Sequence, residues 1–160
     1  MLILRGSPAF SPFRLAKLLQ DLTAAGLPVR ALGAEFVHVV DLVNNPEPVE
    51  RVVETAGELT PAERTVLENL LTYGPRRAAA AVTGLLQVVA PRPGTISPWS
   101  SKATDIAHIR GLANVKRIER VIAYTLDFGS GYSLPATHSS LLQQKLHDRM
   151  TQAVFNDLDA

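Results

Sequence analysis

An internal repeat constrains the fold of this chain more than any other feature. At an offset of 86 residues, Ser11–Phe13 matches Ser97–Trp99, and Gly26 and Gly111 agree at 85. The other matched segments are 2–3 with 88–89, 29–32 with 115–118 and 36–42 with 122–128. Because a helix cap, a helix end and a strand agree in the same order, we infer two strand-helix-strand-helix halves related by pseudo-twofold symmetry.

Proline and hydroxyl residues mark where the helices begin. Ser11-Pro12, Thr60-Pro61 and Ser97-Pro98 each offer an N-cap followed by proline at the first helical position, and a fourth helix is expected from about Thr137. The inward positions expected on the last two helices are Ala103, Ile106 and Ala107, then Leu142, Leu146, Met150 and Ala153. The fold class that follows is α+β.

Apolar runs between the helices predict the strands. Residues 2–4, 35–42, 85–90 and 118–128 are rich in Val, Ile, Leu and aromatic residues, which favours a mainly antiparallel sheet with helices packed on it. Residues 1–160 are expected to form one N-terminal domain with halves at about 1–75 and 83–155. Residues 43–59 are predicted to be a surface excursion, and 156–160 the start of a truncated linker.

Charge and composition exclude several classes of protein. A net charge of +1 without runs of like charge gives no field for nucleic-acid binding. The absence of cysteine removes disulfides, thiolate metal sites and cysteine nucleophiles. No HExxH or G-x-S-x-G motif is present, so no catalytic or metal-binding residue is assigned. Neither a signal peptide nor a membrane-spanning run is evident, and we expect a cytoplasmic protein.

One polar segment stands out as a candidate site. Its hydroxyls and cations crowd around the start of the third helix, where unpaired amides and the helix dipole favour an anion such as phosphate or carboxylate. In the simpler alternative, Ser97 and Ser100 only cap the helix and Trp99 packs beneath it. The candidate interface or substrate-proximal residues are Arg92, Thr95, Ser97, Trp99, Ser100, Ser101, Lys102, Thr104 and Asp105.

Four runs of sequence carry a family resemblance. They are Leu4–Ala9, Leu70–Pro75, Pro91–His108 and Leu146–Thr151. Together they resemble the N-terminal region of the large, single-chain phosphoribosylformylglycinamidine synthases of purine biosynthesis. The resemblance implies a fold like a fused dimer of the small subunit of the multi-subunit enzyme, which agrees with the repeat.

The resemblance also carries expectations about activity. The parent enzyme is implied to be a carbon-nitrogen ligase that uses glutamine, ATP and magnesium to convert formylglycinamide ribonucleotide to formylglycinamidine ribonucleotide. Its cysteine nucleophile is implied to lie in a C-terminal glutaminase, so this chain alone is expected to be inactive and to need no cofactor. Its implied partners are the synthetase and glutaminase portions, which it bridges for ammonia transfer. The alternative is a free-standing α+β module that binds small anions or oligomerises.

Overall fold

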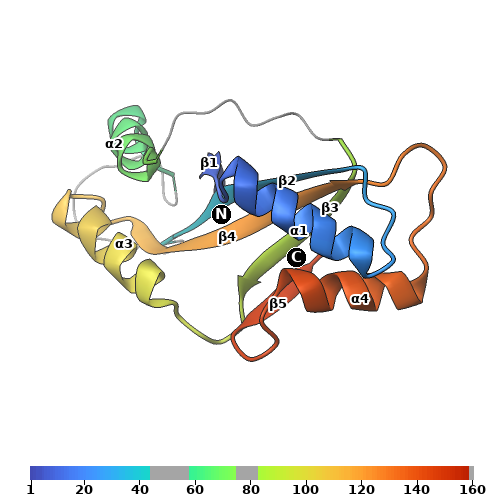
Figure 1. The fold of residues 1–160 in the computed structure, drawn as a ribbon. Coiled ribbons are helices and arrows are strands. Elements are labelled where there is room, and N and C mark those ends of the chain that lie inside the picture. The colour runs from blue at the N-terminus through green and yellow to red at the C-terminus, as the bar shows by residue number, and fades with distance from the viewer. Residues whose placement is uncertain (44–57, 75–82, 159–160) are drawn as a thin grey trace. The chain divides into compact units, whose positions relative to one another are not determined.

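The computed structural model describes residues 1–43, 58–74 and 83–158. The elements, in chain order, are β1 (Leu2–Pro8), α1 (Pro12–Ala24), β2 (Ala31–Leu42), α2 (Pro61–Leu71), β3 (Leu85–Pro91), α3 (Pro98–Ile109), β4 (Val115–Asp127), α4 (Ala136–Leu146) and β5 (Gln152–Phe155) (Figure 1). The strands form one sheet in the order β1-β2-β4-β3-β5, and β3 pairs antiparallel with both β4 and β5. The α+β prediction is confirmed. Within these ranges, no helix has both the length and the apolar character needed to cross a bilayer.

The caps predicted from sequence place the first three helices. Ser11, Thr60 and Ser97 each have extended backbone angles and accept a hydrogen bond from an amide three residues on, with proline at the next position. Helix α1 therefore begins 86 residues before α3, as the repeat requires. Gly26 and Gly111, which follow these two helices, have φ of +92° and +84°, a left-handed region that glycine enters without strain. Superposition of the two halves stays a prediction.

The C-terminal helix is shorter than the sequence analysis expected. Helix α4 ends at Leu146, and the Asp148 carboxylate accepts hydrogen bonds from the Met150 amide at 2.8 Å and the Thr151 hydroxyl at 3.2 Å. An aspartate that binds its own following backbone favours a turn over a helix. Met150 is consequently 80% exposed, and Ala153 lies in β5, paired with β3. Their assignment to an inward helix face was wrong.

Strand lengths and one helix position also differ from expectation. Strand β2 begins at Ala31 and β4 at Val115, several residues before the apolar runs that predicted them, and β1 continues to Pro8. Ile106, expected to face inward on α3, is 41% exposed, whereas Ala107 is fully buried. The predicted surface excursion at 43–59 lies, except for its ends, outside the described residues.

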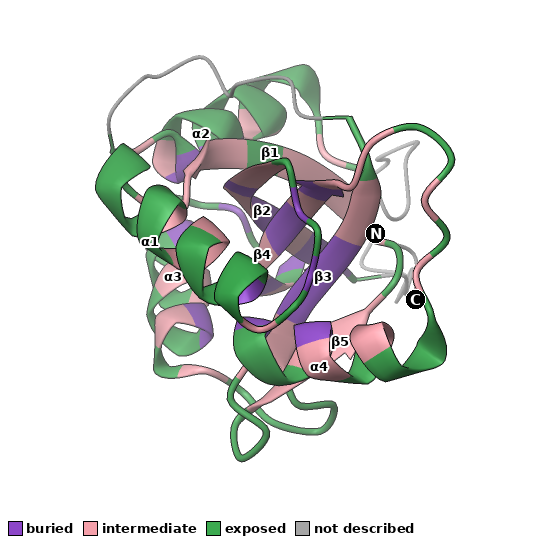
Figure 2. Cartoon of the chain, turned by 45° about the vertical axis from the view of Figure 1, so that its right-hand side comes forward, coloured by how far each residue is buried: buried purple, intermediate pink, exposed green. Residues whose placement is uncertain are grey.

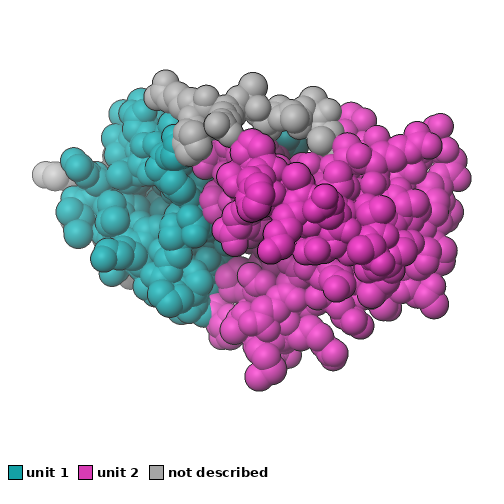
Figure 3. All heavy atoms as spheres, viewed as in Figure 1, with its two compact units in different colours: residues 1–6, 37–74, 96–120 teal, residues 7–36, 75–95, 121–160 magenta. Residues whose placement is uncertain are grey.

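The chain divides into two compact units, which Figure 3 colours separately. Each unit has its own apolar core, and Figure 2 colours the buried residues of the chain purple. Within the described ranges, unit 1 comprises residues 1–6, 37–43, 58–74 and 96–120, and unit 2 comprises 7–36, 83–95 and 121–158. The core of unit 1 packs Leu67 of α2 with Ala107 of α3 and Ile118 of β4. The core of unit 2 packs Leu22 of α1 with Leu142 of α4. Each core thus draws helices from both sequence halves.

Candidate functional site

Ser97 caps α3, as the sequence predicts, and also contacts strand β4. Its hydroxyl oxygen accepts a hydrogen bond from the Ser100 amide at 3.0 Å. The same hydroxyl donates to a carboxylate oxygen of Glu119 on β4 at 2.7 Å. A serine hydroxyl can accept and donate at once, so Ser97 ties the first turn of the helix to the strand.

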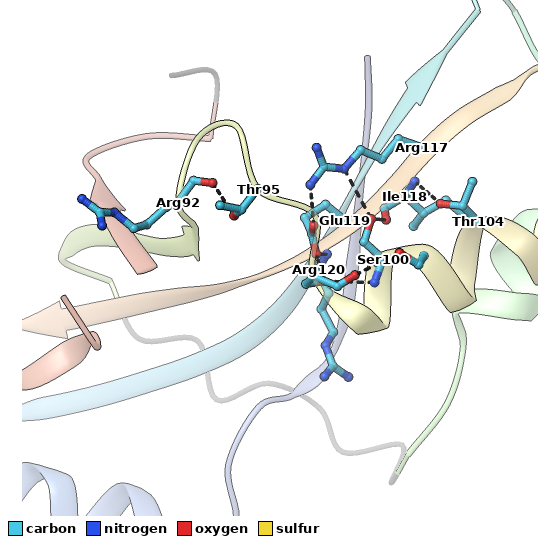
Figure 4. Close-up of polar contacts among 10 residues, drawn as sticks. Arg92, Thr95, Ser100, Thr104, Arg117, Ile118, Glu119 and Arg120 are labelled. Carbon is cyan, nitrogen blue, oxygen red and sulfur yellow. Dashed lines mark hydrogen bonds and ion pairs between the residues drawn. The ribbon is translucent and has the colours of Figure 1, made fainter. Parts of the chain in front are cut away.

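Further hydrogen bonds hold α3 against β4 (Figure 4). The Ser100 hydroxyl, which is fully buried, donates to the Ile118 carbonyl at 2.6 Å. Thr104 Oγ1 accepts from the Ile118 amide at 3.0 Å. Arg117 Nε donates to Ser100 Oγ at 3.3 Å. Both main-chain polar groups of Ile118 are therefore bound by side chains of α3.

Glu119 supplies a negative charge at this end of α3. Arg117 Nη2 donates to its carboxylate at 2.7 Å, and the Glu119 side chain is 13% exposed. Burial alone would raise the pKa of Glu119, but hydrogen bonds from Arg117 and Ser97 outweigh burial and lower the pKa below its ordinary value. A helix N-terminus favours an anion, and the sequence suggested a bound phosphate or carboxylate at this place. The carboxylate of Glu119, a residue of unit 1, is an anion that already lies there.

A second cluster of side chains fixes Trp99. His38 of β2, only 1% exposed, stacks on Trp99 with ring centroids 5.6 Å apart. The His38 Nε2 atom lies 2.7 Å from the Tyr73 hydroxyl. Arg120 lies over the Trp99 ring at 4.8 Å and donates to the Tyr73 hydroxyl at 3.3 Å. Trp99 is thus held by β2, β4 and the residues that follow α2.

The charge state of His38 follows from this packing. Burial and, to a smaller extent, the neighbouring Arg120 guanidinium lower the pKa of His38 to about 4, and the main chain of Leu4 offsets only part of this shift. His38 is therefore neutral at pH 7. A neutral imidazole can stack beside Arg120 without charge repulsion, which keeps the cluster around Trp99 intact.

An apolar pocket of about 500 Å³ lies beside this cluster in unit 1. Leu70 of α2 and Ile106 of α3 contribute to its walls, together with the rings of Tyr73 and Trp99. Among its described lining residues, Lys102 alone carries a charge. The exposure of Ile106, which sequence reasoning placed in the core, is explained by this pocket. Its volume suits an inserted side chain or a small molecule.

The nine candidate residues belong partly to unit 1 and partly to unit 2. Arg92 and Thr95 belong to unit 2, where the Thr95 hydroxyl donates to the Arg92 carbonyl at 2.6 Å in a turn (Figure 4). The other seven lie in unit 1, where Ser97, Ser100 and Thr104 meet at β4. Trp99 and Lys102 line the pocket. Ser101 and Asp105 occupy exposed positions on α3.

Five residues of this site were missed by sequence reasoning. They are His38, Tyr73, Arg117, Glu119 and Arg120. The charges of Glu119 and Arg120, just before the apolar run 121–124 of the strand, were an available signal, since a partly buried charge needs a partner. His38 likewise has an apolar valine on either side in β2. Tyr73 gave no signal of its own, because its contacts with His38 and Arg120 are distant in sequence.

The remaining histidines of the described ranges make structural contacts. His108 Nε2 lies 2.6 Å from the Val115 carbonyl, and His138 Nδ1 lies 2.7 Å from the Tyr132 hydroxyl. His147 contacts the Gln143 carbonyl at the end of α4. Over the same ranges, no three His, Asp or Glu side chains are grouped so that they could hold a metal ion.

Comparison with known families gives a match over most of the chain. A family model described as formylglycinamide ribonucleotide amidotransferase N-terminal matches residues 35–160. The matched range contains the hydrogen bonds between α3 and β4, the cluster around Trp99 and the pocket. Both groups of contacts therefore lie in the part of the chain that the family covers.

Proposed function

Because the chain belongs to the formylglycinamide ribonucleotide amidotransferase N-terminal family, we propose that it is the assembly domain of a phosphoribosylformylglycinamidine synthase. In this role it bridges the synthetase and glutaminase portions of the parent enzyme and supports the passage of ammonia between them. It takes no part in bond making or breaking. The proposal places the domain in the cytoplasm with the rest of the enzyme.

One observation supports a role in assembly rather than in chemistry. The polar side chains of the candidate segment that contact β4, namely Ser97, Ser100 and Thr104, bind groups of unit 1 itself. Such hydrogen bonds fix the position of α3 and leave the exposed surface beside Trp99 and Lys102 in one defined place. A surface held in this way suits contact with another domain, because little side-chain freedom is lost when the partner binds.

The charge at the start of α3 does not favour the nucleotide of the parent enzyme. The first turn of α3 already faces the carboxylate of Glu119, which would repel the phosphates of ATP. We therefore assign ATP and magnesium to the synthetase portion. Glutamine hydrolysis is assigned to the glutaminase portion, because this chain has no cysteine to act as nucleophile.

The same carboxylate weighs against the alternative of a free-standing module that binds small anions. An anion at the α3 N-terminus would have to displace Glu119 from Ser97 and Arg117. Oligomerisation of the isolated chain is a separate matter that sedimentation can measure. The assembly role accounts for both the family membership and the internally satisfied polar groups.

Activity assays of the isolated chain test the proposal. We expect no release of glutamate from glutamine and no release of ADP from ATP, because the chain has neither a cysteine nucleophile nor a nucleotide-binding loop. The control is the same preparation after a second purification, which removes contaminating enzymes. Turnover above the blank that survives repurification would contradict the proposed function.

A further inference from the structure

We propose that the pocket beside Trp99 is a docking socket for another domain of the parent enzyme, and that it receives an apolar side chain standing next to an acidic residue. This inference rests on the proposed function and identifies the surface that carries it out. The residues of the socket on which the argument rests are Leu70, Tyr73, Trp99, Lys102, Ile106 and Ile118. All six residues belong to unit 1.

The apolar walls of the socket favour an apolar side chain on the partner. Leu70, Ile106 and Ile118 offer only hydrocarbon, and Tyr73 and Trp99 add ring surface. The Tyr73 hydroxyl is occupied by His38 and Arg120, so it has little left to offer a polar ligand. Burial of a Leu- or Phe-sized side chain in such a pocket removes its apolar surface from water, which favours binding.

Exposed apolar residues extend the socket along both helices. Ile106 is 41% exposed, Ile109 lies one turn further along α3 and is 82% exposed, and Val66, one turn before Leu70 on α2, is 37% exposed. Apolar side chains gathered around a pocket are typical of protein interaction sites, and an anchor side chain in a central pocket commonly dominates such an interface. The extent of this surface favours a polypeptide over a small molecule.

Lys102 favours an acidic residue on the partner, beside the apolar side chain. It lies in the N-terminal part of α3, where the helix dipole disfavours a cation. No ion pair joins Lys102 to an acidic side chain within the described ranges, whereas Lys116 pairs with Asp41 and Arg117 with Glu119. A carboxylate on the partner would complement Lys102 at the edge of the socket, which is why we infer an acidic residue beside the anchor.

Two of the residues that α3 contributes to the socket are not repeated on α1. At the offset of 86 residues, Lys102 corresponds to Ala16 and Ile106 corresponds to Gln20 on α1. Neither the cation nor the apolar wall is reproduced there. We therefore expect the partner segment to bind beside α3 and not at the corresponding place on α1.

Because Trp99 is the single tryptophan of the chain, it reports directly on the socket. The experiment labels this chain with ¹⁵N and titrates it with the unlabelled remainder of the parent enzyme, expressed without its own copy of this domain. Only one indole N–H signal is then visible, whatever tryptophans the partner contains. We expect this signal to shift or broaden in step with complex formation.

Charge variants test which chemistry the socket recognises. Lys102→Glu should raise the dissociation constant roughly tenfold, and Ile106→Asp should raise it further by placing a charge in the apolar wall. Lys17→Glu and Gln20→Asp on the exposed surface of α1 are the matched controls, and we expect them to bind within about twofold of the unaltered chain. Thermal melts establish that every variant is folded.

The outcomes separate this inference from the proposed function. If the complex forms while the Trp99 signal stays unchanged and Lys102→Glu binds normally, the socket inference is wrong and the assembly role stands. If no complex forms at micromolar concentrations with a remainder that thermal melts show to be folded, both are contradicted. If both charge variants weaken binding and both controls do not, the socket is supported.

Discussion

The hydroxyl of Ser97 lies 2.7 Å from the carboxylate of Glu119 while it accepts the Ser100 amide that it caps. One side chain therefore completes a helix terminus and joins that helix to β4. At the equivalent position of the repeat, the Ser11 side chain makes a longer cap contact of 3.4 Å to the Arg14 amide, and among the described residues it has no other hydrogen-bond partner. Position 33, which corresponds to Glu119, is glycine, so no carboxylate is available there.

This difference between repeat positions gives the first prediction. Ser11→Ala should lower the free energy of unfolding by about 1 kcal/mol, the usual cost of losing an N-cap. Ser97→Ala should cost about 2–3 kcal/mol, because it also removes a hydrogen bond from a charged group. Urea titration of both variants measures the two losses. Equal losses would mean that the Glu119 contact adds no stability.

The second prediction concerns acid. The pKa of His38 is lowered by burial from 6.5 to about 4, so between these values the unfolded chain binds the proton more tightly than the folded one. The contribution of His38 to stability is therefore complete above pH 6.5 and is lost as the pH falls toward 4. The full difference amounts to about 3 kcal/mol.

The His38→Gln variant isolates this effect. A glutamine can still hydrogen bond Tyr73 but does not titrate, so its free energy of unfolding should fall less between pH 7.5 and 4.5 than that of the unaltered chain. His138→Gln, which leaves His38 in place, is the matched control and should behave like the unaltered chain. Parallel stability curves for all three proteins would refute the assignment.

The third prediction separates stability from function at Lys102. Lys102→Ala should leave the melting temperature of this chain unchanged or raise it, because a cation near a helix N-terminus opposes the helix dipole. In the full-length parent enzyme, the same change should lower glutamine-dependent synthesis. Lys17→Ala, on α1, should alter neither property. Normal turnover and substrate affinity in the Lys102→Ala enzyme would show that this part of the segment is structural only.

The parts of the fold that could be predicted are those in which the interacting residues are close together in the sequence. The Ser-Pro and Thr-Pro caps lie within four residues of the amides they bind, so the starts of α1, α2 and α3 could be predicted from sequence. Strand β5 could not, because its four residues are stabilised by pairing with β3, more than 60 positions earlier. The end of α4 was mispredicted because apolar residues continue at helical spacing beyond Leu146, whereas the turn at Asp148 ends the helix there.

The candidate site shows the same division. The cap role of Ser97 is local and could be predicted, whereas its bond to Glu119 spans 22 positions. The cluster around Trp99 combines β2, β4 and the residues after α2, so no window of sequence contains it. The expectation of an anion at the α3 N-terminus had a sound physical basis, but sequence could not show that Glu119 lies there. The pocket beside Lys102 likewise exists only once α2 and α3 pack together.

The assembly role is tested most directly by restoring synthesis in trans. The remainder of the parent enzyme, lacking its own copy of this domain, is assayed for formylglycinamidine ribonucleotide with glutamine or with ammonia, before and after this chain is added. We predict that the chain raises glutamine-dependent synthesis at least severalfold and brings glutamate release and product formation toward equal rates. A chain that forms the complex but leaves both rates unchanged would contradict the account.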